Sequence, residues 1–515
     1  MYTRLMDVKI FTLLAALQIG AALAQARDSN SCESLKGLSL PDASVMLAEA
    51  RPNASYTVTG LGMPPYTGRG GPADRSVRLP GHCRVVAAIK PTADSDIRVD
   101  LWLPANGWNR KVLGVGNGGW SGSIRSGAMV SALVEGYATA STDTGHEGNS
   151  ASFALGHPEK LIDFEYRAVH EMTTKAKAII MQFYGSGPQH SYWNGCSGGG
   201  KQGLKEAQRY PADYDGIVTG APTNYKTHMH AWQMNLSHSA LSDKASYIPP
   251  SKYGLINSAV LAACDALDGI RDGILNDPRK CHFDPGVLLC RGSESGDCLT
   301  APQVEMARKM YAPVIDRQTG KVIYPGLEPG TELGWAGLIG GPQPFGLAHD
   351  LFRYLVHKDA NWDWHSFDLE RDTAAADSEY KDTMNALEPD LRAFAGHGGK
   401  LILWHGLSDP FGAPQNTIDY YRSVIGVAGS KREEFVRLFL APGVQHCGGG
   451  SGPNQFQVVA ALERWVEGGI APDQMLAAHV TENQVDMTRP LCPYPQVAQW
   501  KGVGSTNDAS NFVCK

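Results

Sequence analysis

The sequence lacks any long apolar run beyond its first residues. After residue 24, no stretch offers the ~18 uninterrupted apolar residues that a membrane-spanning helix needs. It also lacks an excess of basic residues, because 46 Lys and Arg stand against 52 Asp and Glu, for a formal net charge of −6. This mildly acidic balance argues against nucleic acid or an anionic membrane as a partner. Internal repeats and low-complexity tracts are absent as well.

The first residues have the pattern of a secretory signal peptide. Arg4 and Lys9 precede an apolar run from about residue 10 to 17, and the small-x-small sequence Ala22-Leu23-Ala24 follows. A membrane anchor is the alternative, but the run is too short to cross ~30 Å of hydrocarbon. We therefore expect residues 1–24 to be removed and the mature protein to be secreted or periplasmic, with no membrane partner.

Cysteine is scarce but even in number. The ten cysteines all lie after the expected cleavage site, and in an exported chain an even number predicts five disulfides. Proximity in sequence suggests four pairs and leaves the remaining two cysteines for each other, although proximity alone leaves other pairings open. The suggested pairs are Cys32–Cys83, Cys264–Cys281, Cys290–Cys298, Cys492–Cys514 and, by elimination, Cys196–Cys447.

Two stretches of the chain alternate short apolar runs with helical patterns. At 515 residues the chain exceeds the usual size of one domain. The alternation, over 98–222 and again over 399–468, predicts a largely parallel α/β sheet. The predicted strands are RVDLWLP, KVLGVGNGG, YATASTDT, SYWNGCS, GIVTGAP, GKLILWHG and RLFLAPG, and the predicted helices include AVHEMTTKAKAIIMQFYG, TIDYYRSVIGV and QFQVVAALERWVEGG.

Residues 223–396 interrupt this rhythm with Gly/Pro-rich loops and a cysteine-bounded acidic segment. Structureless connections beyond ~15 residues are uncommon in compact domains, so we interpret the segment as an inserted lid with a functional role. Residues 25–222 and 397–515 then form the two parts of the sheet domain. The lid carries many aromatic residues, most of which we expect to fill a small core of its own: Trp232, Trp335, Phe345, Phe352, Tyr354, Trp362, Trp364 and Phe367.

The segment Gly195-Cys196-Ser197-Gly198-Gly199 fits the G-x-S-x-G pattern of a nucleophile elbow. It lies between a predicted strand and a predicted helix, where the glycines allow a tight turn that exposes the serine Oγ. A purely structural Gly-rich turn is the alternative. A serine hydroxyl needs a neutral imidazole to take its proton and a carboxylate to orient that imidazole, so the next question is whether an acid and a histidine follow.

Both follow in the chain order of α/β-hydrolases, with Asp409 just past the strand KLILW and His446 just past the strand RLFLA. We therefore predict a catalytic triad of Ser197, Asp409 and His446. The residues His405, His146 and Asp143 also occupy strand ends and are competitors, but a position after the last strands favours His446.

The neighbours of these residues complete the predicted site. If Ser197 and His446 lie within hydrogen-bond reach, Cys196 and Cys447 can approach the ~5.5 Å Cα separation that a disulfide needs. Such a bond would clamp the nucleophile to its base. The Gly-rich loop GVGNGGWSG is placed like an oxyanion-hole loop, and we predict the N–H groups of Gly119 and Gly198 as the donors.

The lid segment CDALDGIRDGILNDPRKC predicts a cation site. Three carboxylates in one cystine-closed loop repel one another unless a hard cation or solvent intervenes, and oxygen ligands at this density suit Ca²⁺. The spacing is not that of an EF-hand, and a solvated acidic turn is the alternative. We expect a structural Ca²⁺; the candidate ligands are Asp265, Asp268 and Asp272, with backbone carbonyls of Ile270 and Ile274.

The segments GCSGGG, LSDP and HC resemble the tannase and feruloyl esterase family, and GNGGWSG, YDGIVTGAP, CDALDGIRDGI, LILWHGLSDPF and RPLCPYPQVAQWKG are family-like too. The resemblance covers nearly the whole mature chain. It implies an α/β-hydrolase fold with a large inserted lid, a structural calcium in that lid, and a disulfide joining the neighbours of the catalytic serine and histidine. It also assigns the triad, bridge and calcium-ligand roles to the residues named above.

By this resemblance the substrate is a small aromatic ester. Mono(2-hydroxyethyl) terephthalate hydrolases of the family carry Glu after the nucleophilic serine, where this chain has Gly198, and this departure favours a feruloyl-esterase-like enzyme acting through an acyl-Ser197 intermediate. A tannase or a terephthalate-ester hydrolase is the alternative within the family. A calcium-stabilised aromatic-binding module without activity is the alternative outside it, and the complete triad argues against that module.

Overall fold

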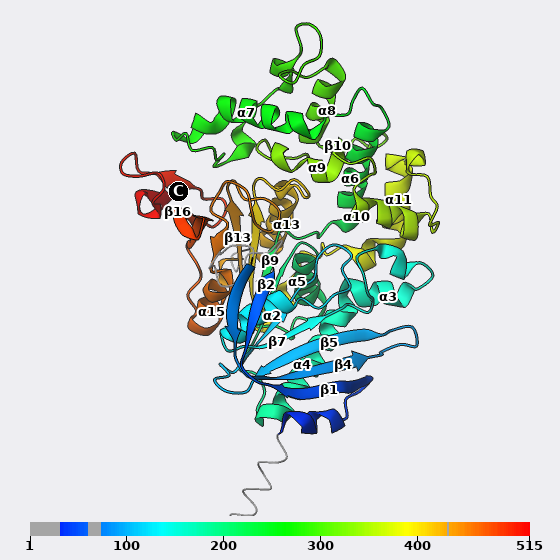
Figure 1. Cartoon of the computed structure of the whole chain (residues 1–515), viewed down its shortest axis with the longest axis vertical. Helices are drawn as coiled ribbons and strands as arrows, with labels where there is room; N and C mark the ends of the chain where they lie inside the picture. Colours follow the sequence, from blue (N-terminus) through cyan, green and yellow to red (C-terminus); the bar gives the residue numbers. More distant parts are fainter. Residues whose placement is uncertain (1–30, 60–73, 430–431) are drawn as a thin grey trace, which may run out of the picture.

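The computed structural model describes residues 31–59, 74–429 and 432–515. The predicted signal peptide lies outside these residues. One sheet of nine strands, in the order β1-β4-β5-β7-β6-β8-β9-β12-β13, organises the chain (Figure 1). Its strands are β1 (Ala43–Arg51), β4 (His82–Ile89), β5 (Ile97–Pro104), β6 (Lys111–Val115), β7 (Ala138–Thr142), β8 (His190–Cys196), β9 (Gly216–Gly220), β12 (Lys400–Gly406) and β13 (Val436–Ala441).

The sheet is parallel on one side and antiparallel on the other. From β7 through β6, β8, β9 and β12 to β13, every neighbouring pair runs parallel. Strands β1, β4, β5 and β7 pair antiparallel instead. The prediction of a parallel sheet is therefore right from β6 onward and wrong for RVDLWLP, which is β5. That run is buried at nearly every position, and continuous burial does not reveal strand direction.

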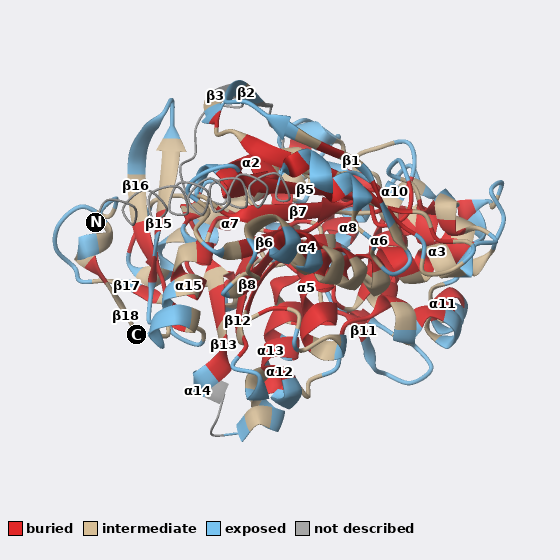
Figure 2. Cartoon of the chain, turned by 90° about the horizontal axis from the view of Figure 1, so that it is seen from below, coloured by how far each residue is buried: buried red, intermediate tan, exposed pale blue. Residues whose placement is uncertain are grey.

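Helices cover both faces of the sheet. Along β12, Leu401 and Leu403 point into one hydrophobic core while Ile402 and Trp404 point into the other, as the two-residue period of a strand requires. Figure 2 shows this burial concentrated along the sheet and its flanking helices. The first core is closed by α4 (Ala168–Tyr184), α5 (Gly198–Arg209) and α13 (Pro414–Ala428), and the second by α2 (Ser126–Val134) and α15 (Val458–Gly468).

The segment between β9 and β12 lies beyond one end of the sheet, in green and yellow in Figure 1. It is more helical than its sequence suggested. Helix α6, for example, is buried on most of its faces, so it lacks the one-sided apolar period by which helices are found. Its elements are α6 (Lys226–Leu241), α7 (Tyr253–Cys264), α8 (Ala301–Tyr311), β10 (Val314–Ile315), β11 (Val322–Tyr324), α9 (Ala336–Ile339), α10 (Gly346–Asp350), α11 (Leu369–Met384) and α12 (Arg392–Gly396).

Most buried apolar residues of the lid form one hydrophobic cluster, which also includes Trp120 and Phe164 of the sheet domain. Trp232, Trp335 and Phe352 are fully buried within it, each at 0% exposure. These aromatic side chains therefore hold the lid together, as expected for most of its aromatic residues.

Smaller elements complete the fold. The predicted helix QFQVVAALERWVEGG begins only at Val458, because Gln455 and Phe456 pair with Ala477 and Ala478 in a separate sheet. The remaining elements are β2 (Ala54–Thr59), β3 (Asp74–Leu79), α3 (Pro158–Ile162), α14 (Arg432–Phe435), β14 (Gln455–Phe456), β15 (Met475–Thr481), β16 (Gln484–Leu491), β17 (Ala498–Trp500) and β18 (Phe512–Cys514).

All five predicted disulfides are present: Cys32–Cys83, Cys196–Cys447, Cys264–Cys281, Cys290–Cys298 and Cys492–Cys514. Within the described parts of the chain, no helix is both long enough and apolar enough to cross a membrane.

Candidate active site

Ser197 lies at the sharp turn between β8 and α5. Its backbone has φ 61° and ψ −121°, a conformation that non-glycine residues rarely adopt and that functional sites often hold under strain. The Ser197 N–H donates to Gly220 O at 2.9 Å. A Cβ atom on Gly195 would lie only 2.3 Å from Gly199 O, so the turn can close only with glycine at that position. The local sequence thus builds the predicted elbow.

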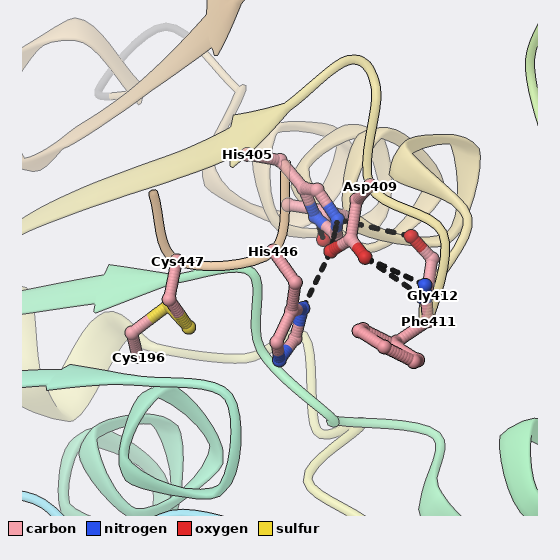
Figure 3. The surroundings of a disulfide bond; sticks show 8 residues. Cys196, His405, Asp409, Phe411, Gly412, His446 and Cys447 are labelled. Carbon is pink, nitrogen blue, oxygen red and sulfur yellow. Dashed lines mark hydrogen bonds and ion pairs between the residues drawn. A yellow bond between two sulfur atoms is a disulfide. The ribbon is translucent and has the colours of Figure 1, made fainter. Parts of the chain in front are cut away.

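Asp409 and His446 lie at the ends of the neighbouring strands β12 and β13 and contact each other. His446 Nδ1 donates to Asp409 Oδ2 at 2.6 Å (Figure 3). Asp409 is fully buried, and its Oδ1 accepts from the N–H groups of Phe411 at 2.8 Å and Gly412 at 3.2 Å. Among the described residues no hydrogen bond to the second ring nitrogen of His446, Nε2, is formed, so this nitrogen is available to accept from a serine hydroxyl.

Asp409 and His446 change each other's pKa: that of Asp409 is lowered and that of His446 is raised. Burial alone would raise the pKa of Asp409, but the facing His446, together with hydrogen bonds from His405 and His446, outweighs burial and holds that pKa well below its usual range. Burial alone would lower the pKa of His446, but the Asp409 charge and hydrogen bond raise it above its ordinary value of 6.5. The carboxylate is therefore ionised, and the imidazole is a stronger base than a free histidine.

A disulfide joins the chain neighbours of the serine and the histidine. Cys196 and Cys447 are bonded with a Cα–Cα separation of 5.9 Å, across 251 residues of sequence (Figure 3). Because Ser197 follows one cysteine and His446 precedes the other, the bond fixes the end of β8 against the loop after β13. The structure thus brings the predicted bridge and triad residues into one place at the carboxyl ends of the strands.

The competing histidine His405 supports the acid rather than the serine. Its Nε2 lies 3.0 Å from Asp409 Oδ2 and 3.1 Å from Gly412 O, while its Nδ1 lies 2.7 Å from Thr417 Oγ1. These partners assign the proton to Nε2, which donates to the carboxylate, with the threonine hydroxyl donating to Nδ1. His405 and His446 therefore contact the same carboxylate oxygen. Sequence reasoning did not foresee this role, although the spacing of four residues between His405 and Asp409 is a usable signal.

The other competitors belong to the loop after β7. His146 Nε2 lies 2.8 Å from Trp120 O, and its ring stacks on Phe153 with centroids 3.7 Å apart. Burial lowers the pKa of His146 to about 4. Asp143 accepts from the N–H groups of Arg98 and Gly145, both at 2.8 Å. In the described structure neither residue bonds to Asp409 or His446, so the triad pairing goes to His446.

The glycine-rich loop after β6 packs directly on the elbow. A Cβ on Gly198 would lie 3.5 Å from Gly119 N, so the two predicted oxyanion donors adjoin each other. Gly119 itself has φ +55°, a conformation that favours glycine. The loop is tied to α5, because Asn117 N donates to Gln202 Oε1 at 3.0 Å. This Asn117–Gln202 contact was not predicted from sequence.

Apolar side chains from the lid reach the same place. Phe411 meets the His446 ring edge-on at 5.7 Å, and Phe345 of the lid stacks on Phe411 at 5.5 Å. Leu347, also of the lid, lies beside Gly119, where a Cβ would come within 3.1 Å of its side chain. Trp120 Nε1 donates to Leu347 O at 3.0 Å. The lid therefore borders the triad with an apolar, partly aromatic surface.

The predicted cation loop presents its carboxylates to its own backbone. Burial raises the pKa of Asp268, and the charges of Asp272 and Asp265 add to this shift, while the Ile270 N–H and the charge of Arg489 oppose it. Asp272 Oδ2 also accepts from the buried Arg489 at 2.8 Å, which links the loop to β16. The backbone partners are Gly273 N for Asp265, Ile270 N for Asp268 and Ile274 N for Asp272, at 3.0 to 3.2 Å. Oxygen donors of this kind suit Ca²⁺, but in this structure the three carboxylates accept from the loop backbone and do not form a group within 4.8 Å of one another.

Known proteins resemble this chain over almost its full length. It is 36% identical to an uncharacterised esterase of Xanthomonas campestris pv. campestris, over 96% of this chain and 93% of that protein. It is 31% identical to a probable feruloyl esterase B of Aspergillus clavatus, over 98% of this chain and 99% of the relative.

Solved structures agree with these relatives. The crystal structure of feruloyl esterase B from Aspergillus oryzae matches with a TM-score of 0.85 at 29% identity, covering 94% of this chain and 99% of that one. Tannin acyl hydrolase from Aspergillus niger shares the fold, with a TM-score of 0.76 at 23% identity over 93% and 92% of the two chains. These neighbours confirm the predicted α/β-hydrolase fold. A family model described as tannase and feruloyl esterase matches residues 83–515, and the chain therefore belongs to this family.

Proposed function

We propose that this protein hydrolyses esters of phenolic carboxylic acids, in the manner of a feruloyl esterase, with Ser197, His446 and Asp409 as its triad. The observation that carries the proposal is the bridged pair: Cys196–Cys447 places the chain neighbours of serine and histidine together, and His446 contacts Asp409 at 2.6 Å. Membership of the family and the feruloyl esterase names of its relatives support the substrate class.

The reaction proceeds through an acyl-enzyme. Ser197 Oγ attacks the ester carbonyl carbon while His446 Nε2 takes the hydroxyl proton. The imidazolium then gives that proton to the departing alkoxide, which leaves as the alcohol. Water attacks the acyl-Ser197 by the same route and releases the free acid. Asp409 keeps the imidazole in the required tautomer and stabilises its positive charge.

The negative charge that develops on the carbonyl oxygen needs fixed donors. We assign this role to the N–H groups of Gly119 and Gly198, whose backbones adjoin at the elbow. The Asn117–Gln202 hydrogen bond keeps the donor loop in register with the nucleophile helix. Because the donors are backbone groups on packed elements, they need little reorganisation during the reaction.

The aromatic acyl group has a matching surface in the lid. Phe345 and Phe411 stack on each other beside His446, and Leu347 covers Gly119. A phenolic ring placed against them would bury apolar area and keep the ester carbonyl near the donors. We therefore assign acyl recognition to the lid segment that carries Phe345 and Leu347.

We also propose that the loop closed by Cys264–Cys281 binds a structural Ca²⁺ through the side chains of Asp265, Asp268 and Asp272 and the carbonyls of Ile270 and Ile274. When bound, the ion would add positive charge beside these carboxylates, in addition to that of Arg489. Chelation with EGTA should lower the melting temperature, and added Ca²⁺ should restore it. An unchanged melting temperature would contradict this assignment.

The same set of disulfides supports an exported protein. Five disulfides are typical of oxidising compartments, and the predicted signal peptide would direct the chain there. We propose a secreted or periplasmic location. Fractionation of a host that expresses the full chain, followed by sequencing of the mature N-terminus, tests both points.

A parallel substrate panel tests the proposed function. Methyl ferulate, methyl gallate and mono(2-hydroxyethyl) terephthalate are hydrolysed by wild type and Ser197→Ala side by side. We expect the highest kcat/KM with ferulate and no turnover by the variant. Preference for gallate or terephthalate would keep the mechanism and change the substrate. Turnover by Ser197→Ala equal to wild type would overturn the triad.

A further inference from the structure

A second cluster of ionisable side chains lies at the opposite end of the nucleophile helix. His170 of α4, Glu206 of α5 and Asp213 of the following loop place one nitrogen and two carboxylate oxygens within 4.8 Å of one another. Glu206 follows Ser197 by nine residues, or about 14 Å along a helix. Ester hydrolysis therefore makes no use of this cluster.

Glu206 is the unusual member. Its side chain is completely buried, at 0% exposure, and no N–H donor of the described residues bonds either carboxylate oxygen, although the neighbouring Asp213 carboxyl group is close enough to share a proton with it. A carboxylate buried without a donor is strongly destabilised in its ionised form unless a positive charge or a proton joins it. Asp213 lies beside Glu206 and is a second acidic group. A bound cation would therefore be stabilised by both carboxylates.

The other two members are ordered and can be reached from solvent. His170 Nδ1 lies 2.6 Å from Asp213 Oδ2, and the imidazole ring stacks on Tyr210 with centroids 3.8 Å apart. The His170 side chain remains 28% exposed, and that of Asp213 is 14% exposed. Two of the three candidate ligands are therefore partly exposed to solvent, while Glu206 lies behind them in the core.

We propose that His170, Glu206 and Asp213 bind a divalent transition-metal ion, with Zn²⁺ as the best match. One imidazole nitrogen with two carboxylate oxygens is a ligand set that Zn²⁺ uses, whereas Ca²⁺ prefers oxygen alone. Ligand distances of ~2.0–2.2 Å require the three side chains to close slightly around the ion, with water in the fourth position. The site is separate from the lid loop assigned to Ca²⁺.

The position of the cluster suggests what the ion does. It would join α4, α5 and the turn before β9, and so fix the far end of the helix that begins at Ser197. Lys177 is the competing source of positive charge, because its Nζ donates to the backbone oxygen of Asp213. The test must therefore separate a metal site from a cluster that Lys177 or a shared proton neutralises.

Zinc binding to the full-length protein provides the test. Metal-free protein is returned to Ca²⁺-containing buffer, dialysed against a Zn²⁺ series and analysed for bound zinc, with melting temperature as the second readout. We expect one zinc per chain and a higher melting temperature in wild type. His170→Gln should weaken binding by roughly 100-fold or more, because even an outer partner of a metal ligand is worth about 10- to 100-fold.

A control variant and a second site variant distinguish zinc binding at this cluster from the general effect of losing a histidine. His157→Gln removes another histidine–aspartate pair, with Asp94 at 2.9 Å, but no buried glutamate, and should leave zinc binding unchanged. Glu206→Gln should also abolish the zinc-dependent rise in melting temperature. The proposal is overturned if wild type binds no more zinc than His170→Gln. It is overturned equally if Glu206→Gln matches or exceeds wild-type stability while zinc stabilises neither, which indicates a shared proton.

Discussion

The sheet domain and the lid border the same site but hold their residues there by different means. In the sheet domain, Ser197, Asp409 and His446 follow the parallel strands β8, β12 and β13, and a disulfide fixes two of those strand ends to each other. The lid instead brings Phe345 and Leu347 to the site from a hydrophobic cluster that it shares with Trp120 and Phe164 of the sheet domain.

We infer that the sheet domain determines the rate of the chemical step and that the lid determines substrate binding. Residues at the ends of adjacent parallel strands have few ways to move, because the strands are hydrogen-bonded over their whole length. Lid residues reach the site through side-chain contacts, such as that of Leu347 with Gly119, and through the hydrogen bond from Trp120 Nε1 to Leu347 O. We therefore expect changes in the sheet domain to affect kcat and changes in the lid to affect mainly KM and substrate choice.

Removing the charge of the triad acid should have the largest effect. Asp409→Asn keeps the side-chain shape but loses the acceptor that fixes the His446 tautomer, so kcat should fall by about 10⁴-fold. Steady-state kinetics with methyl ferulate measures this loss. Asp143→Asn, a buried acid at the end of β7, is the control and should retain near wild-type kcat. Comparable losses in the two variants would contradict the assignment of Asp409.

Opening the bridge should have the next largest effect. In Cys196→Ala/Cys447→Ala the serine and histidine lose their covalent clamp, and a displacement of ~1 Å can lower kcat by roughly 100-fold. Loss of the 251-residue closure should also reduce the free energy of unfolding, by ~5 kcal/mol at most.

The control for the bridge is a disulfide away from the site. Cys290→Ala/Cys298→Ala opens a closure of only eight residues in the lid and should leave kcat unchanged. Kinetics and denaturant titration of both double variants separate the two effects. Equal kcat in wild type and in Cys196→Ala/Cys447→Ala would show that strand pairing alone positions the triad.

The catalytic residues of the sheet domain could be predicted from the sequence. Ser197, Asp409 and His446 were placed together in advance because apolar runs mark the strands, and strand ends meet at one edge of a parallel sheet. Cys196 and Cys447 were predicted to pair because they adjoin two of those residues. Each inference needed only local pattern and chain order.

Other contacts depend on packing that no local pattern encodes. His405 Nε2 contacts Asp409 Oδ2, but the sequence WHGLSDP does not indicate on which side of the carboxylate the His405 ring lies. Helix α6 is buried nearly all round, so its period was hidden and the lid looked richer in loops than it is. The antiparallel direction of β5 was missed for a similar reason, since a strand that is buried on both faces shows no alternation from which its direction could be inferred.

Truncating a lid aromatic should affect binding rather than chemistry. Phe345→Ala removes a ring stacked on Phe411, and aromatic contacts of this kind contribute about 0.5–1.5 kcal/mol. KM for methyl ferulate should therefore rise by up to about tenfold, while kcat and the KM for a short aliphatic ester stay near wild type. Leu333→Ala, at a lid position that is 60% exposed, is the control. A fall in kcat with unchanged KM would place Phe345 in the chemistry instead.

The smallest expected effect is a shift in the pH profile. His446 must be neutral to accept the Ser197 proton, and Asp409 raises the pKa of His446 above 6.5. Protonation at low pH removes the base, so the acid limb of kcat/KM should have its midpoint above pH 6.5. In Asp409→Asn burial is no longer opposed by the carboxylate, and the midpoint of the residual activity should move below that of wild type. A wild-type midpoint below 6.5, or no movement in the variant, would mean that the strand-end carboxylate does not control the base.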